Sequence, residues 1–256
     1  MMPPALSGLL FALGMSVAAG LVGTVAVMRR MTLASDAISH VALPGVGLAL
    51  LLQVNPVLGG LAALFAGTML VWAVERKTQL PTEAIIGVVF SAALAIGSML
   101  TTGEELLEAL FGTARAPGTT ETLFGLAGAV LVILFITQAR SQLVVTLVSP
   151  DLARTAGINV SRLNLLFLLG FAVTVALGLR FLGVLLMGSL IIIPAATAKH
   201  LARSLRSMQL IAVAIATLAT LVGTMAAPAL HAEPGPLTIT IAAGIFVLSL
   251  GFRRGR

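Results

Sequence analysis

The sequence predicts an all-helical protein that crosses a membrane many times. Of its 256 residues, 59% are hydrophobic and 9% are charged, and the mean hydropathy is +1.11. A soluble domain cannot bury so much apolar surface, so the bilayer is the expected solvent. Apolar runs of about 17 to 25 residues, the length that spans a bilayer as a helix, recur along the chain. The polar loops between them are too short to fold alone, so we expect one membrane domain over residues 1–256.

Nine apolar segments are predicted to span: 7–28, 36–53, 57–74, 83–101, 122–138, 163–180, 182–199, 208–228 and 236–252. The first carries small residues at four-residue intervals, which predicts close packing with another helix. The seventh is the weakest, because Gly183, Gly188 and Pro194 interrupt it, and we expect a broken or re-entrant helix there. The predicted count is about nine spans, with eight as the alternative if 163–199 folds differently.

The distribution of charge predicts the orientation. If the N-terminus is outside, only Arg115 and Arg180 of the 15 Lys and Arg residues fall outside. This strong positive-inside bias also predicts a cytoplasmic C-terminus. The basic residues do not form a stripe with interleaved aromatic side chains, so the net charge of +6 does not indicate a nucleic-acid partner. The chain has no cysteine, which excludes disulfides, thiolate ligands and thiol catalysis.

The main candidate site is the pair Asp36 and His40, which lie four residues apart and therefore on one face of a helix. Ionisable side chains in a membrane segment are costly and usually mark an ion or substrate path. Carboxylate oxygen and imidazole nitrogen also suit a divalent first-row metal. On these residues alone, however, a structural explanation is favoured. In it, Ser35 caps the helix, Asp36 stabilises its first turn and His40 is a buried, hydrogen-bonded imidazole.

Two further segments are candidates for function. Residues 150–160 predict a short cytoplasmic helix, because Pro150 suits a first turn and Gly157 the position just past a helix end. This helix is either an ordinary connector or a docking element for a soluble partner. Glu83 begins a span, where an acid stabilises the first turn, and it could also face an ion path. No Gly-x-x-x-x-Gly-Lys-Ser/Thr loop is present for binding ATP.

In these segments the chain resembles the permease subunits of ATP-binding-cassette importers for zinc, manganese and iron, the ABC-3 metal-ion permeases. The most specific match is residues 28–45, which read MRRMTLASDAISHVALPG. Ordered matches follow at 83–91, 110–112, 151–158 and 183–195, so the resemblance covers nearly the whole chain. Many relatives carry Asp where this chain has Glu83, and the carboxylate is therefore kept.

The resemblance implies a fold similar to vitamin B12-type importer permeases, in a bacterial-type inner membrane. It implies two permease copies, a homodimer in the simplest case, with two cytoplasmic ATPase subunits and an extracytoplasmic metal-binding protein. ATP is then hydrolysed by the partner subunit, so this chain is not itself an enzyme, and the metal is cargo rather than a resident cofactor. The resemblance assigns Asp36, His40 and Glu83 to the metal path. It assigns the coupling helix near 150–160, which docks on the ATPase, to residues including Asp151, Ala153, Arg154 and Gly157.

Other functions are less consistent with the residues. A secondary metal transporter working without ATP usually needs several intramembrane acids, which are scarce here. A permease for a larger metal chelate gives no reason for the Asp36 and His40 pair. A non-transporting membrane scaffold is a further alternative. The residues do not select among zinc, manganese and iron.

Overall fold

The computed structural model describes residues 4–78, 80–100, 118–179 and 183–251, without the side chains of 4–6, 33–36 and 183–185. Over these ranges the regular structure is helical and contains no strand, which confirms the predicted class. The long helices are α1 (Pro4–Met28), α4 (Pro56–Lys77), α5 (Thr82–Leu100), α7 (Thr119–Gln138), α10 (Val160–Leu179), α11 (Gly183–Leu201), α12 (Leu205–Leu230) and α13 (Pro234–Gly251). The short helices are α2 (Thr32–His40), α3 (Leu43–Leu51), α8 (Arg140–Val148) and α9 (Pro150–Thr155).

All nine predicted apolar segments are helical over most of their described residues. In the described ranges, 7 helical segments have the length and composition to cross a membrane: Ser7–Met28, Pro56–Lys77, Thr82–Leu100, Thr119–Gln138, Val160–Leu179, Leu205–Ala226 and Pro234–Gly251. Two further apolar segments, Ala37–Leu51 and Leu186–Leu201, are shorter within the residues whose side chains the structure describes. The predicted count of eight or nine spans is therefore not confirmed. Arg115 and Arg180, on which the orientation depends, lie outside the described residues.

The interruption predicted within 182–199 is wrong. Helix α11 is continuous from Gly183 to Leu201, with Pro194 inside it. A proline removes one helical hydrogen bond, which a packed helix tolerates when neighbouring helices hold it in place. Helix α11 packs on α1, α2, α12 and α13, and so it is supported along its length.

The helix break lies instead between α2 and α3, at Val41 and Ala42. Pro44 explains it, because proline has no N–H to donate to the carbonyl four residues earlier and its ring crowds that carbonyl. The amides of Val41 and Ala42 donate to the carbonyls three residues before them, at 3.1 and 3.2 Å. This is the tighter 3₁₀ pattern, and the segment predicted as one span is therefore two helices of 9 residues each.

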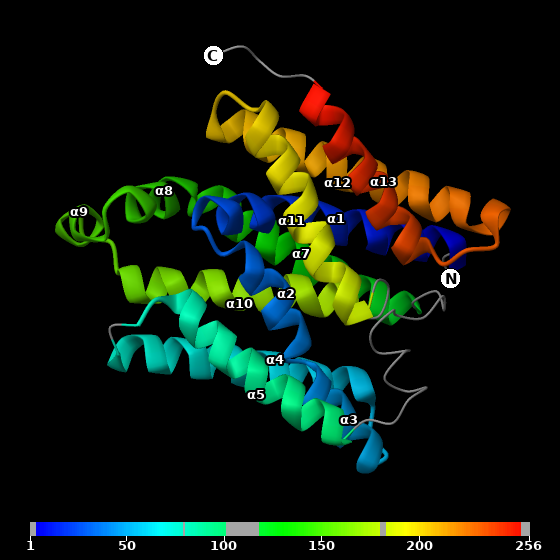
Figure 1. Cartoon of the computed structure of the whole chain (residues 1–256), viewed down its shortest axis with the longest axis horizontal. Helices are drawn as coiled ribbons and strands as arrows, with labels where there is room; N and C mark the ends of the chain where they lie inside the picture. The colour runs from blue at the N-terminus through cyan, green and yellow to red at the C-terminus, as the bar shows by residue number, and fades with distance from the viewer. Residues whose placement is uncertain (1–3, 79, 101–117, 180–182, 252–256) are drawn as a thin grey trace.

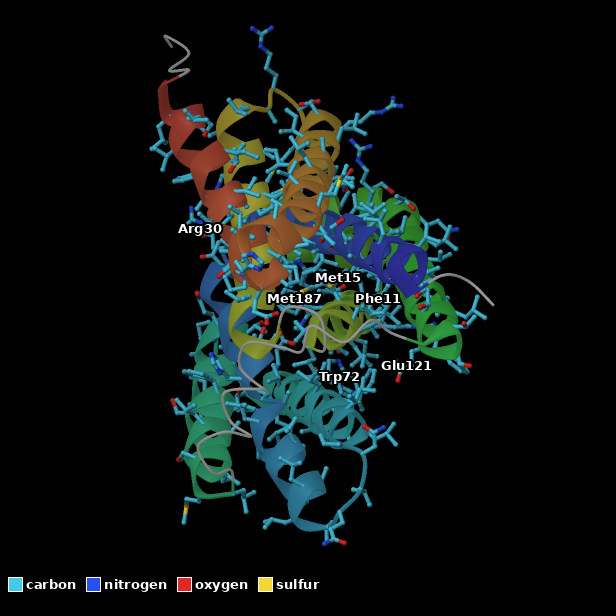
Figure 2. The ribbon with its side chains drawn as sticks, turned by 90° about the vertical axis from the view of Figure 1, so that its right-hand side faces the viewer. Phe11, Met15, Arg30, Trp72, Glu121 and Met187 are labelled. Atoms are coloured by element: carbon cyan, nitrogen blue, oxygen red, sulfur yellow. The ribbon has the colours of Figure 1, made fainter. Side chains whose placement is uncertain are left out.

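Helix α1 lies at the centre of the larger group of helices, where it packs on α7, α10, α11 and α12 (Figure 1). Figure 2 places Met15 and Met187 in the interior, and both are buried. The predicted small-residue packing face of α1 is confirmed. A Cβ on Gly20 would meet the backbone of Val213 in α12, and the Ser16 hydroxyl lies 3.5 Å from that of Thr217.

Helices α3, α4 and α5 form a second group, seen below α10 in Figure 1. Helix α2 joins the two groups, because it packs on α11 and α10 as well as on α5. The contact between α3 and α4 depends on Gly45 and Gly59. A Cβ on either glycine would collide with the backbone carbonyl of the other, so both positions need glycine for this close approach.

Candidate functional site

Helix α2 begins earlier than the sequence predicts, and this changes the interpretation of Asp36. The N-cap residue is Met31, without a side-chain cap, and the first turn holds no acid. Ser35 therefore does not cap the helix, and Asp36 is not in its first turn, so that part of the structural explanation is wrong. The side chain of Asp36 lies outside the described residues. Its backbone position is one helical turn before His40, as the predicted pair requires.

His40 closes α2 inside the bundle. Its side chain is 9% exposed, and its ring centroid lies 5.5 Å from that of Phe90 in α5, with the rings tilted by 52°. Helices α2 and α3 together have a length of about 30 Å, at about 1.5 Å per residue. His40 lies about 12 Å from the start of α2 on the same scale. It therefore lies about two helical turns beyond the start of α2, in the interior of the bundle.

Glu83 lies in the first turn of α5, as predicted, and it is exposed. It precedes Phe90 by two turns, which is about 10 Å along the helix axis. The structure thus places Glu83 and His40 on elements in contact, α5 and α2, at different depths. Among the described side chains, no three His, Asp or Glu residues come together as potential metal ligands. The assignment of Asp36, His40 and Glu83 to a metal path stays a prediction.

The predicted cytoplasmic helix is present as α9, and its ends have the predicted residues. Pro150 is its first residue, and the Ser149 hydroxyl accepts a hydrogen bond from the Leu152 amide at 3.2 Å. Asp151 and Arg154 form an exposed ion pair at 2.6 Å. Ala153 is fully buried, so α9 packs by one face and presents its charged residues to solvent.

The connection from α9 to α10 is tightly hydrogen-bonded. Gly157 has a φ of +79°, a left-handed conformation that favours glycine. The Gly157 amide donates to the Arg154 carbonyl at 3.0 Å, and the Ile158 amide donates to the Ala153 carbonyl at 2.9 Å. This pair of bonds is a Schellman motif. The exposed helix is therefore fixed to the start of α10 rather than joined to it by a loose loop.

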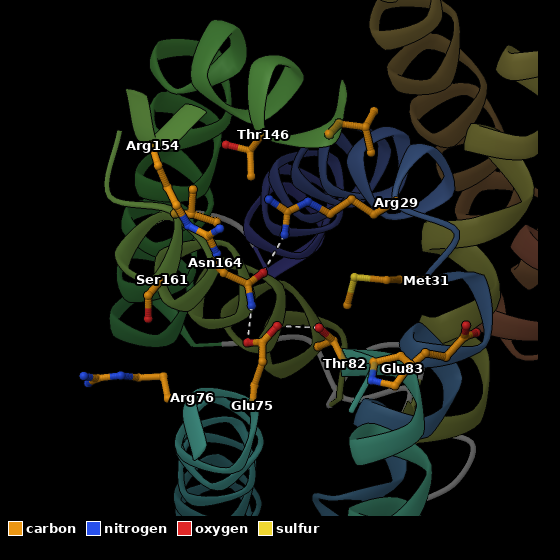
Figure 3. A pocket seen from close by; sticks show the side chains of 13 residues that line it. Arg29, Met31, Glu75, Arg76, Thr82, Glu83, Thr146, Arg154, Ser161 and Asn164 are labelled. Atoms are coloured by element: carbon orange, nitrogen blue, oxygen red, sulfur yellow. Dashed lines mark hydrogen bonds between the residues drawn. The ribbon is translucent and has the colours of Figure 1, made fainter. Parts of the chain in front are cut away.

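A cavity of about 650 Å³ lies between α9 and the adjoining ends of α1, α4, α5 and α10 (Figure 3). Its wall contains a hydrogen-bonded chain of four side chains. Arg29 donates to the Asn164 side-chain carbonyl, Asn164 donates to Glu75, and Thr82 donates to the other Glu75 oxygen, each at 2.5 Å. Glu83 also lines the cavity, with its carboxylate turned away from Glu75 in Figure 3.

Arg29 is the charge at the centre of this wall. Its guanidinium lies 4.6 Å from the centroid of the buried Phe167 ring, a cation–π contact. Arg29 follows the spanning part of α1, and burial lowers its pKa to about 10, while the negative charge of Glu75 acts to raise the pKa. The guanidinium thus remains protonated at pH 7 and can attract Glu75 through Asn164.

With this geometry in view, the comparisons with known proteins decide the family. A family model described as the ABC 3 transport family matches residues 2–253. The chain belongs to this family. The resemblance that rests on residues 28–45 and the later segments is therefore confirmed.

Relatives in the ABC 3 transport family cover nearly the whole chain. The high-affinity zinc uptake system membrane protein ZnuB of Haemophilus influenzae is 33% identical over 241 residues, which cover 91% of each chain. The manganese import system permease protein ScaB of Streptococcus gordonii is 28% identical over 247 residues, covering 95% of this chain and 89% of that one. A solved structure of PsaBC from Streptococcus pneumoniae in complex with Fab has a TM-score of 0.82 at 25% identity, covering 98% of this chain and 92% of that chain.

The sequence did not predict two features of this region. Helix α8 is one, although Leu143 and Leu147 at four-residue spacing are a signal for a helix, and Leu143 is buried. The other is the chain of side chains around Glu75. The available signal was Asn164, a single amide in the apolar run of α10, together with Glu75, an acid next to Arg76 and Lys77.

Proposed function

We propose that this chain is the membrane permease subunit of an ATP-driven importer of a divalent metal ion. The observation that carries the proposal is the match to the ABC 3 transport family over residues 2–253. Relatives named for zinc uptake and manganese import support a divalent first-row cation as the cargo. The chain then supplies the path, and a separate subunit hydrolyses ATP.

In this proposal Asp36, His40 and Glu83 belong to the metal path. Three observations support it: positions 36 and 40 lie one turn apart in α2, His40 lies at a helix end within the bundle, and α2 packs against α5, which has Glu83 in its first turn. Two permease copies would each offer a carboxylate and an imidazole, which replace the hydration of the cation only transiently. Weak coordination suits transport, because the ion must leave as well as enter.

The proposed partners follow from the family and from α9. Two ATPase subunits would dock on the α9 surface, where Asp151 and Arg154 are exposed and Ala153 and Gly157 fix the helix in place. An extracytoplasmic metal-binding protein would deliver the cation to the opposite face. The permease would be a homodimer with N-termini outside and C-termini in the cytoplasm, working by alternating access.

Metal uptake by single variants tests this function. The chain is expressed with its ATPase and binding protein in a strain that lacks its own zinc and manganese importers, and each metal is made limiting in turn. Asp36→Ala and His40→Ala should abolish uptake while the complex still assembles. The matched control is His231→Ala, because His231 is exposed in the turn between α12 and α13. Uptake by Asp36→Ala at the wild-type rate would refute the metal path.

A further inference from the structure

The side chains around Glu75 connect the ends of four helices. Neither the proposed metal path nor the α9 docking surface accounts for this connection. Arg29 follows the end of α1, Glu75 is in the last turn of α4, Thr82 begins α5, and Asn164 is in the second turn of α10. Asn164 is the central member, because its carbonyl accepts from Arg29 and its amide donates to Glu75 (Figure 3). One amide thus lies between two opposite charges from different helices.

A rigid path leads from α9 to Asn164. The Schellman motif fixes α9 to Ile158, and the next residue, Asn159, caps the start of α10 by accepting from the Arg162 amide at 2.9 Å. Asn164 follows one turn later on the same helix. A displacement of α9 would therefore move Asn164, because hydrogen bonds hold the connection between them.

Burial makes this connection costly to break. Asn164 is 8% exposed, and the Phe167 ring beneath Arg29 is fully buried. Arg29 and Glu75 are half-buried, and hydrogen bonds to charged groups are stronger than those between neutral groups, so leaving these two charges without the Asn164 amide is unfavourable. When Asn164 moves, the ends of α1 and α4 should follow it, and the Thr82 hydroxyl extends the same connection to α5.

We propose that Asn164 is a positioning residue that makes the cytoplasmic ends of α1, α4 and α5 follow the α9 helix during the transport cycle. The proposal rests on the proposed function, because it assumes that an ATPase moves α9. It assigns to Asn164, Glu75, Arg29 and Thr82 the step that converts movement of α9 into movement of α5, the helix that packs against α2 and His40.

The first test measures metal transported per ATP hydrolysed, using the complete complex in proteoliposomes with zinc or manganese. Asn164→Leu removes both hydrogen bonds at similar volume. We expect assembly and ATP hydrolysis to persist while the ratio falls roughly tenfold, a typical coupling effect. The matched control is Thr174→Val on the same helix, because the buried Thr174 hydroxyl bonds only within α10, to the Gly170 carbonyl at 2.8 Å, among the described residues.

A rescue separates positioning from packing. Asn164→Asp puts a second carboxylate against Glu75, so the transport ratio should fall. Adding Glu75→Gln removes this repulsion, because the introduced amide can donate to the introduced carboxylate, which also accepts from Arg29. We expect the double variant to recover most of the ratio. Failure of this rescue, with the complex intact, would contradict the proposal.

A distance measurement is independent of transport. Because the chain has no cysteine, Arg162→Cys and Ala84→Cys introduce unique labelling sites near the starts of α10 and α5, both exposed. The distance is measured between the two labels within one permease chain. In the otherwise wild-type complex this distance should have one narrow distribution with and without ATP, because α5 follows α10. In the Asn164→Leu complex the distribution should be broad. A narrow distribution and an unchanged ratio in Asn164→Leu would overturn the proposal, as would an equal loss in Thr174→Val. Absence of metal uptake by the wild-type complex would instead overturn the proposed function, and the distances alone would then decide whether Asn164 links the helices.

Discussion

The break between α2 and α3 and the connection between α9 and α10 interrupt the helices by different means. At the first, Pro44 has no N–H to donate, and the backbone of Val41 and Ala42 keeps a right-handed conformation. This break is buried and lies next to His40. At the second, Gly157 takes a left-handed conformation and a Schellman motif holds an exposed helix in place. The first construction ends a helix inside the bundle, at the residue that we propose for the metal path. The second makes a rigid surface element, which suits contact with a soluble partner.

The largest effect is expected at the close contact between α3 and α4, which holds α3 in place after the break. Gly45→Ala places a Cβ against the Gly59 carbonyl, and α3 cannot move away without losing its contact with α4. We expect a loss of about 1–3 kcal/mol of stability, visible as a lower yield of monodisperse protein and a lower Tm in detergent. Gly87→Ala is the control, because its Cβ would meet no atom within 4 Å. Equal behaviour of the two variants would show that α3 and α4 do not depend on this approach.

The next effect concerns the break itself. Pro44→Ala restores the amide that can pair with the carbonyl of residue 40, so α2 and α3 can join into one helix. We expect the protein level to be unchanged and metal uptake to fall severalfold, because His40 loses its place at a helix end. Pro194→Ala is the control, since α11 is already continuous through that proline. Wild-type uptake by Pro44→Ala would show that the break has no role in transport.

For the second region, Arg154→Glu should weaken the association with the ATPase. The Asp151–Arg154 pair is exposed, so its loss should cost the fold less than about 1 kcal/mol. Reduced co-purification would therefore report docking rather than unfolding. Arg162→Glu reverses an exposed charge nearby on α10 and should leave co-purification unchanged. The α9 surface would be the wrong docking site if both variants retained the ATPase equally.

The smallest effect is expected at the connection to α10. Gly157→Ala forces a side chain into a left-handed conformation, at a cost of about 1–2 kcal/mol. The Tm should fall by about 2–4 °C per kcal/mol for a chain of this size. Gly118→Ala is the control, because Gly118 has an ordinary φ of −66° and open space around its Cβ. Equal Tm values for the two variants would contradict the rigid connection.

The sequence predicts the helices well where one local signal dominates. The span predicted at 57–74 is α4, Pro56–Lys77, and the one at 163–180 is α10, Val160–Leu179, because long apolar runs have no alternative in a membrane. Helix α9 was predicted from Pro150 and Gly157 alone, since each fits one position at a helix end.

The sequence fails where two local signals compete or where distant residues meet. Ser35 is a good cap, but α2 starts at Thr32, after a turn in which the Met31 amide donates to the Ala26 carbonyl. Pro44 and Pro194 both lie within predicted spans, yet a helix break precedes Pro44 while α11 is continuous through Pro194. Arg29 and Asn164 are 135 residues apart, so no local pattern reveals their contact.

The most direct test compares the two regions in one experiment, by measuring metal uptake and ATPase co-purification for His40→Ala and Arg154→Glu side by side. His40→Ala should lose uptake and keep the ATPase, while Arg154→Glu should lose both. This result would assign the metal path to the buried end of α2 and the ATPase contact to the exposed α9. Uptake retained by His40→Ala, or an ATPase retained in full by Arg154→Glu, would contradict that division.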